Sequence, residues 1–88
     1  GGGGEPPFAP AEAKMKDAMM SATGANTDRM WASKMIAHHQ GALDMSQVVL
    51  RESQDAGIRR MAQKTIEMQT ADIGELRAWL EAHPGNAG

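Results

Sequence analysis

The chain of 88 residues contains no cysteine and no tyrosine, and only one phenylalanine. Without cysteine there can be no disulfide framework, no thiolate zinc site and no thiol chemistry. Aromatic residues are scarce throughout, whereas Ala, Met, Gln, Lys, Arg and Glu, which all favour helices, are common. The expected fold class is therefore all-α.

The sequence also lacks the features of nucleic-acid-binding proteins, membrane-spanning proteins and enzymes. Nine Lys and Arg residues stand against 11 Asp and Glu, with the two signs interspersed, so no basic surface for nucleic acid is expected. No apolar run approaches the length of a membrane span. No activated nucleophile, paired-carboxylate site or cofactor fingerprint is visible. We therefore expect a protein that is not an enzyme, does not bind nucleic acid and does not span a membrane.

The distribution of Gly and Pro predicts one domain with short tails. Residues 1–10 are rich in Gly and Pro and are predicted to be a disordered linker. Residues 11–83 are predicted to form a single helical domain, and residues 84–88 a C-terminal tail. No secretory signal is visible, and composition alone does not indicate a compartment.

Three helices are predicted within the domain. Pro10 suits the first turn of the first helix, and Asn26 or Thr27 can cap the second. The segment from Ser53 to Gly57 combines capping residues with a glycine and predicts a tight reversal. The predicted helices cover residues 11–22, about 28–53 and about 56–82.

The two long helices must pack as an antiparallel hairpin, because the turn between them is short. Facing residue numbers should then sum to about 109. This register places His38 beside Met68 and Asp72, and it packs Trp31 together with Trp79. A hairpin plus one short helix buries only one side of each long element, so we expect a homodimer that completes a bundle.

The second helix carries an unusual stripe. Spacings of four and three residues place on one line Trp31, Met35, His38, Ala42, Met45 and Val49. We expect this line to be the buried seam of the hairpin. Such a seam normally carries Leu, Ile or Val, whereas here a histidine lies between two thioethers. Methionine is abundant elsewhere too, with 8 residues in the chain.

Thioether and imidazole donors without thiolate suit Cu(I), and imidazole can also hold Cu(II). Met35 can share an ion with His38 or His39 at helical spacing, although the two histidines point about 100° apart. Zinc prefers thiolates or chelating histidine pairs, and the Glu-x-x-His motifs of di-iron bundles are absent. The candidate copper ligands are Met15, Met19, Met35, His38, His39, Met45, Met61 and Met68. Asp72 is the expected hydrogen-bond acceptor behind His38.

A metal-free interpretation stays open beside the copper hypothesis. Methionine is an adaptable core filler, and a buried histidine is commonly a hydrogen-bonded core residue. On this interpretation the chain is a helical dimerisation or interaction module.

Two glycines stand inside the predicted long helices. Gly41 and Gly74 each weaken their helix by about 1 kcal/mol relative to Ala. We expect both to allow close approach of backbones near the histidine pair.

From about Asp28 to Leu80 the chain resembles the bacterial domain of unknown function 305 family. The resemblance is most specific in the Met-Ile-x-His-His-Gln-Gly-Ala sequence that begins at Met35. Members of this family are small secreted helical bundles related in shape to ferritins. They include periplasmic copper-binding proteins implicated in copper tolerance. The resemblance therefore implies a ferritin-like bundle, a periplasmic or secreted location and a role in copper homeostasis.

Carried over by position, the family motif falls on Met35, His38, His39 and Met45. Asp72 stands where the family usually has an acidic residue, commonly Glu. Ala37 replaces a proline often found before the histidine pair, which should leave the helix straighter. The resulting prediction is a protein that sequesters copper, chiefly Cu(I), or passes it to a delivery partner.

Overall fold

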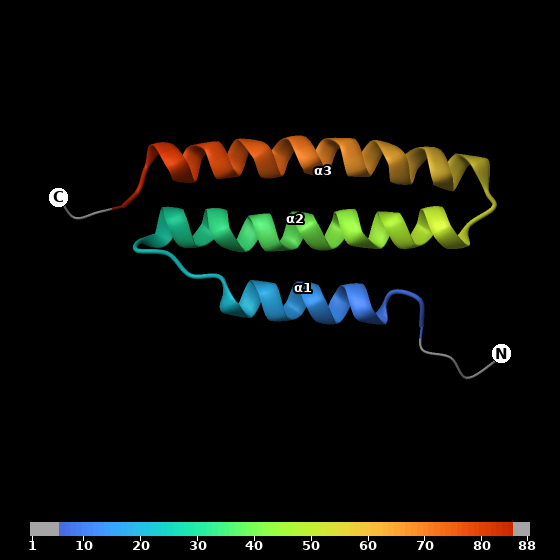
Figure 1. Cartoon of the computed structure of the whole chain (residues 1–88), viewed down its shortest axis with the longest axis horizontal. Helices are drawn as coiled ribbons and strands as arrows, with labels where there is room; N and C mark the ends of the chain where they lie inside the picture. The colour runs from blue at the N-terminus through green and yellow to red at the C-terminus, as the bar shows by residue number, and fades with distance from the viewer. Residues whose placement is uncertain (1–5, 86–88) are drawn as a thin grey trace.

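The computed structural model describes residues 6–85, which form three helices and no strand (Figure 1). Helix α1 spans Ala9–Ser21, α2 spans Thr27–Glu52 and α3 spans Ala56–Ala82. The all-α prediction is confirmed for this part of the chain, in which no helix is long and apolar enough to cross a membrane. The outer parts of the predicted linker and tail, residues 1–5 and 86–88, lie outside the described residues.

Helix α1 begins two residues earlier than predicted. Pro10 lies in its first turn, where a missing N–H is tolerated, and the backbone N–H of Ala9 donates to the carbonyl of Pro6 at 3.1 Å. Phe8 occupies the N-cap position and lines a groove on the molecule. The last part of the predicted linker therefore belongs to the folded domain.

The two long helices start at side-chain caps. The carboxamide oxygen of Asn26 accepts from the backbone N–H of Arg29 at 2.9 Å. A carboxylate oxygen of Asp55 accepts from the backbone N–H of Ile58 at 2.8 Å. Each cap satisfies a backbone donor that has no partner within its helix. The tight reversal between α2 and α3 falls at residues 53–55, as predicted.

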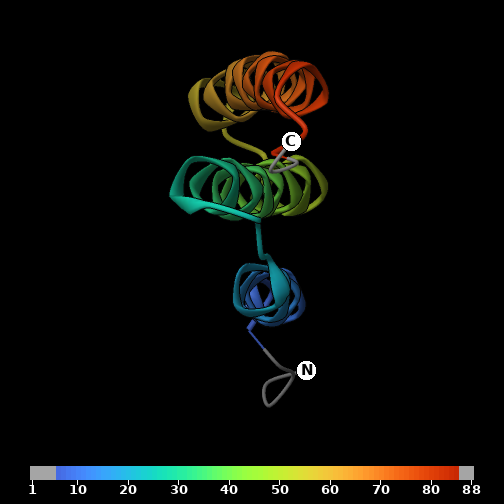
Figure 2. The same cartoon turned by 90° about the vertical axis from the view of Figure 1, so that its left-hand side faces the viewer.

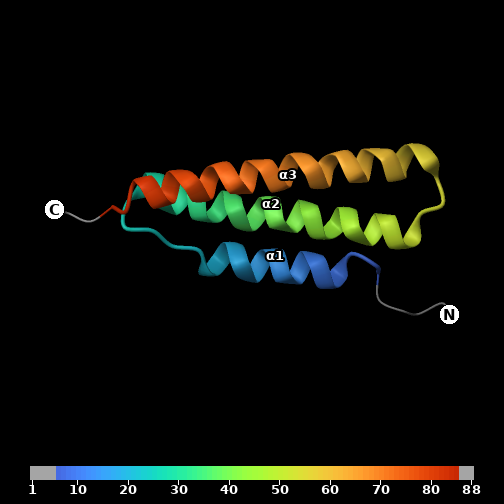
Figure 3. The ribbon, with the colours of Figure 1, turned by 45° about the horizontal axis from the view of Figure 1, so that its top comes forward.

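The α2–α3 hairpin has the predicted antiparallel register. At its open end, the Arg29 guanidinium donates to the carbonyls of Leu80 at 2.8 Å and His83 at 2.5 Å. At the turn, the Arg59 guanidinium donates to the carbonyl of Leu50 at 2.5 Å. Two arginines therefore fasten the hairpin at both ends. Figure 3 shows the ribbons of α2 and α3 running side by side between these ends.

The three helices lie side by side in one layer, with α2 in the middle (Figures 1 and 2). Helices α1 and α3 pack on opposite sides of α2. The molecule measures 56 × 27 × 13 Å, so the layer is about one helix thick. Both broad faces of the layer are consequently open.

Small side chains form the thin core between the helices. No large side chain is wholly buried among the described residues. Small residues allow helix axes to come close, but they bury little apolar surface. The buried residues are Ala11, Ala32, Ala37, Gly41, Ser46, Val48, Ala62 and Ile73.

The predicted buried seam is wrong, because the Trp31–Val49 stripe lies on an open face. Trp31 is 58% exposed and His38 is also exposed. Helix α1 packs beside Gly41 instead, and α3 lies on the opposite side of α2. Two lines of mostly small residues flank the stripe and form the contacts of α2 with α1 and α3. Small side chains allow the neighbouring helices to approach more closely than the bulky stripe would. Gly41 faces α1, so helical periodicity places Ala37 and Val48 on the same side, and it places Ala32, His39 and Ser46 on the side of α3.

Candidate metal-binding groove

A groove of about 420 Å³ opens on the striped face and draws its lining from all three helices. It brings together three of the predicted ligands, Met15 from α1 and both His38 and Met45 from α2. Met15 and Met45 are half-buried, whereas His38 is exposed to solvent. The complete lining is Phe8, Met15, His38, Ala42, Met45, Ser46, Val49 and Thr65.

Met15 reaches α2 because Gly41 has no side chain. A Cβ atom at Gly41 would lie 2.6 Å from Met15 Cγ and 2.8 Å from Met15 Cβ. Gly41 therefore allows a close approach, but the atoms nearest to it belong to the Met15 side chain and not, as predicted, to a neighbouring backbone. At Gly74 the same prediction is wrong, since this residue is exposed and an added Cβ would meet no atom within 4 Å.

The hydroxyl groups of the groove are already bonded to backbone. Ser46 donates to the carbonyl of Ala42 at 2.8 Å, and Thr65 donates to the carbonyl of Met61 at 2.9 Å. The imidazole of His38 makes no hydrogen bond to any described residue. One imidazole and two thioethers are therefore the donors that remain free in the groove.

His39 points away from this groove, as the helical geometry predicts. Its ring centroid lies 6.1 Å from that of His38, with 61° between the ring planes. His39 Nδ1 is buried and has no partner among the described residues, and the same holds for Gln69 Oε1. The hairpin register places these two residues at nearly the same level. Two unsatisfied polar atoms thus lie in the α2–α3 interface, where such atoms are uncommon.

The remaining candidate ligands lie outside the groove lining. Met35 is half-buried one turn before His38, and Met19 is half-buried on α1. The backbone carbonyl of Met19 accepts from Lys34 Nζ at 2.7 Å, which ties α1 to α2. Met61 and Met68 are 58% and 54% exposed on α3. Of the eight methionine and histidine candidates, three line one groove.

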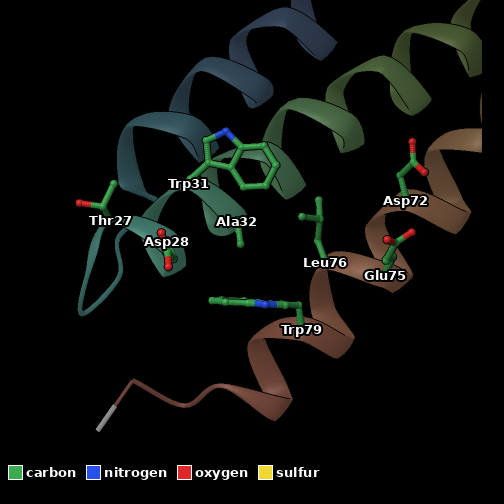
Figure 4. Close-up of a pocket in the computed structure, with 8 residues that line it drawn as sticks. All are labelled: Thr27, Asp28, Trp31, Ala32, Asp72, Glu75, Leu76 and Trp79. Carbon is green, nitrogen blue, oxygen red and sulfur yellow. The ribbon is translucent and has the colours of Figure 1, made fainter. Parts of the chain in front are cut away.

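A second groove, of about 490 Å³, opens near the start of α2 (Figure 4). Trp31 and Trp79 both line it, consistent with the register, but the ring stacked on Trp79 is His83, with centroids 4.3 Å apart. Asp72 also lines this groove and makes no hydrogen bond to His38 among the described residues. The structure therefore shows no support of His38 by Asp72.

Phe8 and Ser46 line the groove although the sequence analysis gives neither a role there. Phe8 falls within residues 1–10, the Gly- and Pro-rich segment that is predicted to be a linker. A lone aromatic residue immediately before a proline-containing first turn was the available signal, since apolar residues at a helix start commonly pack against the domain.

The described part of the chain contains no cluster of carboxylate and imidazole groups that could bind a metal ion preferring oxygen and nitrogen ligands. No three His, Asp or Glu residues come together there as a metal site would require. The residues with metal-binding side chains that line the groove are Met15, Met45 and His38. These donors suit a soft ion, and copper(I) above others.

These features define a small three-helix protein with a thioether–imidazole groove across its central helix. The family model described as "Domain of unknown function (DUF305)" matches residues 7–83. The chain belongs to this family, and the resemblance drawn from its motifs is confirmed. No curated protein was found that matches the chain.

Proposed function

We propose that this protein binds copper, chiefly Cu(I), in the groove formed by Met15, His38 and Met45. The observation that supports the proposal is that two thioethers and a hydrogen-bond-free imidazole line one cavity. If these residues were only core filler, the sulfur atoms would be expected in separate apolar contacts, and the imidazole would be expected to bond to a carbonyl. Imidazole also allows Cu(II) to bind, although the soft thioethers favour the reduced ion.

The exposure of the groove favours sequestration or transfer over catalysis. His38 is exposed, and the groove is open on the face of the layer. A bound ion would therefore remain accessible to a delivery partner protein, unlike an ion in a closed structural site. We place this role outside the cytoplasm, in copper homeostasis and tolerance, because the family resemblance implies it.

A competition titration tests copper binding at this groove. Cu(I) is added under reducing conditions with a chromophoric chelator, using the native chain and His38→Ala, Met45→Ala and Met20→Ala variants. Met20 is 73% exposed on α1 and does not line the groove, so it serves as the control. We expect saturable binding in the native chain and the control, and weaker binding in the other two variants. Absence of saturable binding, or equal affinity in His38→Ala, would contradict the proposal.

A second candidate function rests on the open faces of the layer. We propose that two copies assemble into a ferritin-like bundle, because a layer 13 Å thick buries too little apolar surface alone. In a purely structural dimer, Met and His would serve as interface side chains, and copper would leave the melting temperature unchanged. A ligand specific to the folded state must instead raise it, so thermal unfolding with and without Cu(I) separates the two functions.

A further inference from the structure

The groove near the start of α2, here called the tryptophan groove, has no part in the proposed copper site. Its volume of about 490 Å³ falls within the roughly 300–1,000 Å³ of small-molecule sites. Helices α2 and α3 both contribute side chains to it (Figure 4). None of the described residues that line it is a methionine or a histidine, so its chemistry differs from that of the copper groove.

The two tryptophans of the chain supply the aromatic surface of this groove. Trp31 is 58% exposed. The imidazole of His83 stacks on Trp79, with 15° between the ring planes. Figure 4 shows the Trp79 ring edge-on, with one face turned toward Ala32 and the chain beyond α3 passing on the other side. His83 therefore leaves the groove side of the Trp79 ring uncovered.

Three carboxylates line the same groove without a neighbouring cation. They belong to Asp28, Asp72 and Glu75, and no Lys or Arg is among the lining residues. Within the described part of the chain none of the three forms a salt bridge, whereas Asp44 outside the groove is paired with Lys14. The negative charge of the groove is thus not neutralised by the chain itself.

Helix stability accounts for only one of these carboxylates. Asp28 lies in the first turn of α2, where a negative charge favours the helix. Asp72 and Glu75 lie in the interior of α3, three residues apart, where like charges on neighbouring positions repel each other. A cation bound between them would remove this repulsion.

The arrangement of the carboxylates favours an organic cation over a metal ion. Calcium and magnesium need several oxygen ligands at one point, and no group of three His, Asp or Glu residues that could hold a metal forms within residues 6–85. Aromatic faces attract cations, and exposed apolar surface rimmed by polar groups is typical of ligand-binding grooves. Indole and separated carboxylates together match a ligand that is both flat and positively charged.

We propose that the tryptophan groove binds a small organic cation through its guanidinium group. The planar guanidinium lies against the indole rings, and its N–H groups donate to the carboxylates of Asp72 and Glu75. A guanidinium fits better than an ammonium, because it stacks on aromatic rings, binds carboxylates with two parallel hydrogen bonds and is more weakly hydrated. This binding uses none of the proposed copper ligands and does not depend on copper.

The indole N–H signals in NMR spectra of the copper-free chain test this proposal, because both tryptophans line the groove. The probe is N-butylguanidinium, and N-butylurea is its neutral counterpart of similar shape. We expect saturable shifts of both indole signals with the cation, and binding about tenfold weaker for the urea. No saturable shift with the cation, or equal affinity for the urea, would overturn the proposal.

Butylammonium tests the assignment to a guanidinium. It keeps the positive charge and the butyl chain but lacks the planar group with its parallel N–H donors. We expect it to bind more weakly than butylguanidinium. Equal affinity for the two cations would overturn the assignment to a guanidinium group.

Charge-removing variants locate the ligand within the groove. Asp72→Asn and Glu75→Gln change exposed side chains and leave the core intact, and each should weaken butylguanidinium binding by about tenfold. Glu67→Gln is the matched control, since Glu67 is exposed on α3 and lines neither groove. Trp31→Leu should also weaken binding, as read from the remaining indole signal. Equal affinity in all four variants, or equal losses that include the control, would overturn the proposed site.

Salt dependence in the native chain gives a test that needs no variant. Added salt screens exposed charges, so it should weaken the binding of butylguanidinium and leave that of butylurea unchanged. The same response for both probes would show that the carboxylates do not hold the cation. These measurements contain no copper, so their failure would leave the proposed function standing, and a failure of copper binding would leave this groove unaffected.

Discussion

Replacing Gly41 with alanine perturbs the contact that positions Met15 in the groove. Gly41 is buried where α1 crosses α2, and an added Cβ would lie within 2.8 Å of Met15 Cβ. Gly74 occupies a comparable helix interior, yet an added Cβ there meets nothing within 4 Å. Gly74→Ala is therefore the matched control for the same chemical change.

The two substitutions should have different effects on the free energy of unfolding. Alanine improves an exposed helix interior by about 1 kcal/mol over glycine, so Gly74→Ala should stabilise the fold. The same gain at Gly41 is opposed by overpacking, which destabilises by about 1–3 kcal/mol. Met15 Cγ and Sδ can rotate away, but Met15 Cβ moves only if α1 moves. We therefore expect Gly41→Ala to leave stability unchanged or lower it by up to about 2 kcal/mol.

Thermal and urea unfolding followed by circular dichroism measure this difference. For a domain of this size, 1 kcal/mol corresponds to a shift of about 4–8 °C in melting temperature. Gly41→Ala should also weaken Cu(I) binding, because Met15 is displaced, whereas Gly74→Ala should leave it unchanged. Equal stabilisation by both variants, with equal copper affinity, would refute the packing of α1 against Gly41.

Three further predictions follow from individual contacts. Arg29→Met removes the donor to the Leu80 and His83 carbonyls and should destabilise the hairpin by about 1–3 kcal/mol in urea unfolding. An unchanged free energy of unfolding would show that these hydrogen bonds do not hold the open end of the hairpin together. Asn26→Ala removes the α2 cap and should lower stability by about 1 kcal/mol, whereas Asn26→Gly should lose only a few tenths; equal losses would argue against capping. Free Cu(I) at 100 times its dissociation constant should add about 2.7 kcal/mol to stability in calorimetry, and His38→Ala should abolish most of this gain.

The fold could be predicted largely from local signals. Asn26 and Asp55 cap their helices through their own side chains, so the start of each long helix is encoded within four residues. The short segment at 53–55 forces an antiparallel hairpin, which in turn sets the register that joins Arg29 to Leu80. None of these features depends on how a distant part of the chain packs.

The orientation of α2 could not be predicted in the same way. Its bulky stripe and its two lines of small residues have the same helical periodicity, so each is compatible with a buried seam. The lines of small residues that include Gly41 and Ser46 are the ones buried against the neighbouring helices, because small residues allow helices to approach more closely. The stripe was left open, and its histidine with it.

The ligand set was only partly predictable for a related reason. Helical spacing identifies pairs such as Met35 with His39 on one helix, but it does not say which helix lies beside them. The groove instead joins His38 and Met45 with Met15, which lies more than twenty residues away in sequence. That combination depends on the packing of α1 against Gly41, a tertiary contact that pattern reasoning does not supply.

X-ray absorption at the copper edge tests the central claim most directly. The Cu(I)-loaded chain should show both sulfur and nitrogen neighbours around the metal, as expected for Met15, Met45 and His38. In His38→Ala the nitrogen contribution should fall while sulfur remains. Copper surrounded only by nitrogen and oxygen, or a spectrum that His38→Ala leaves unchanged, would contradict binding in this groove.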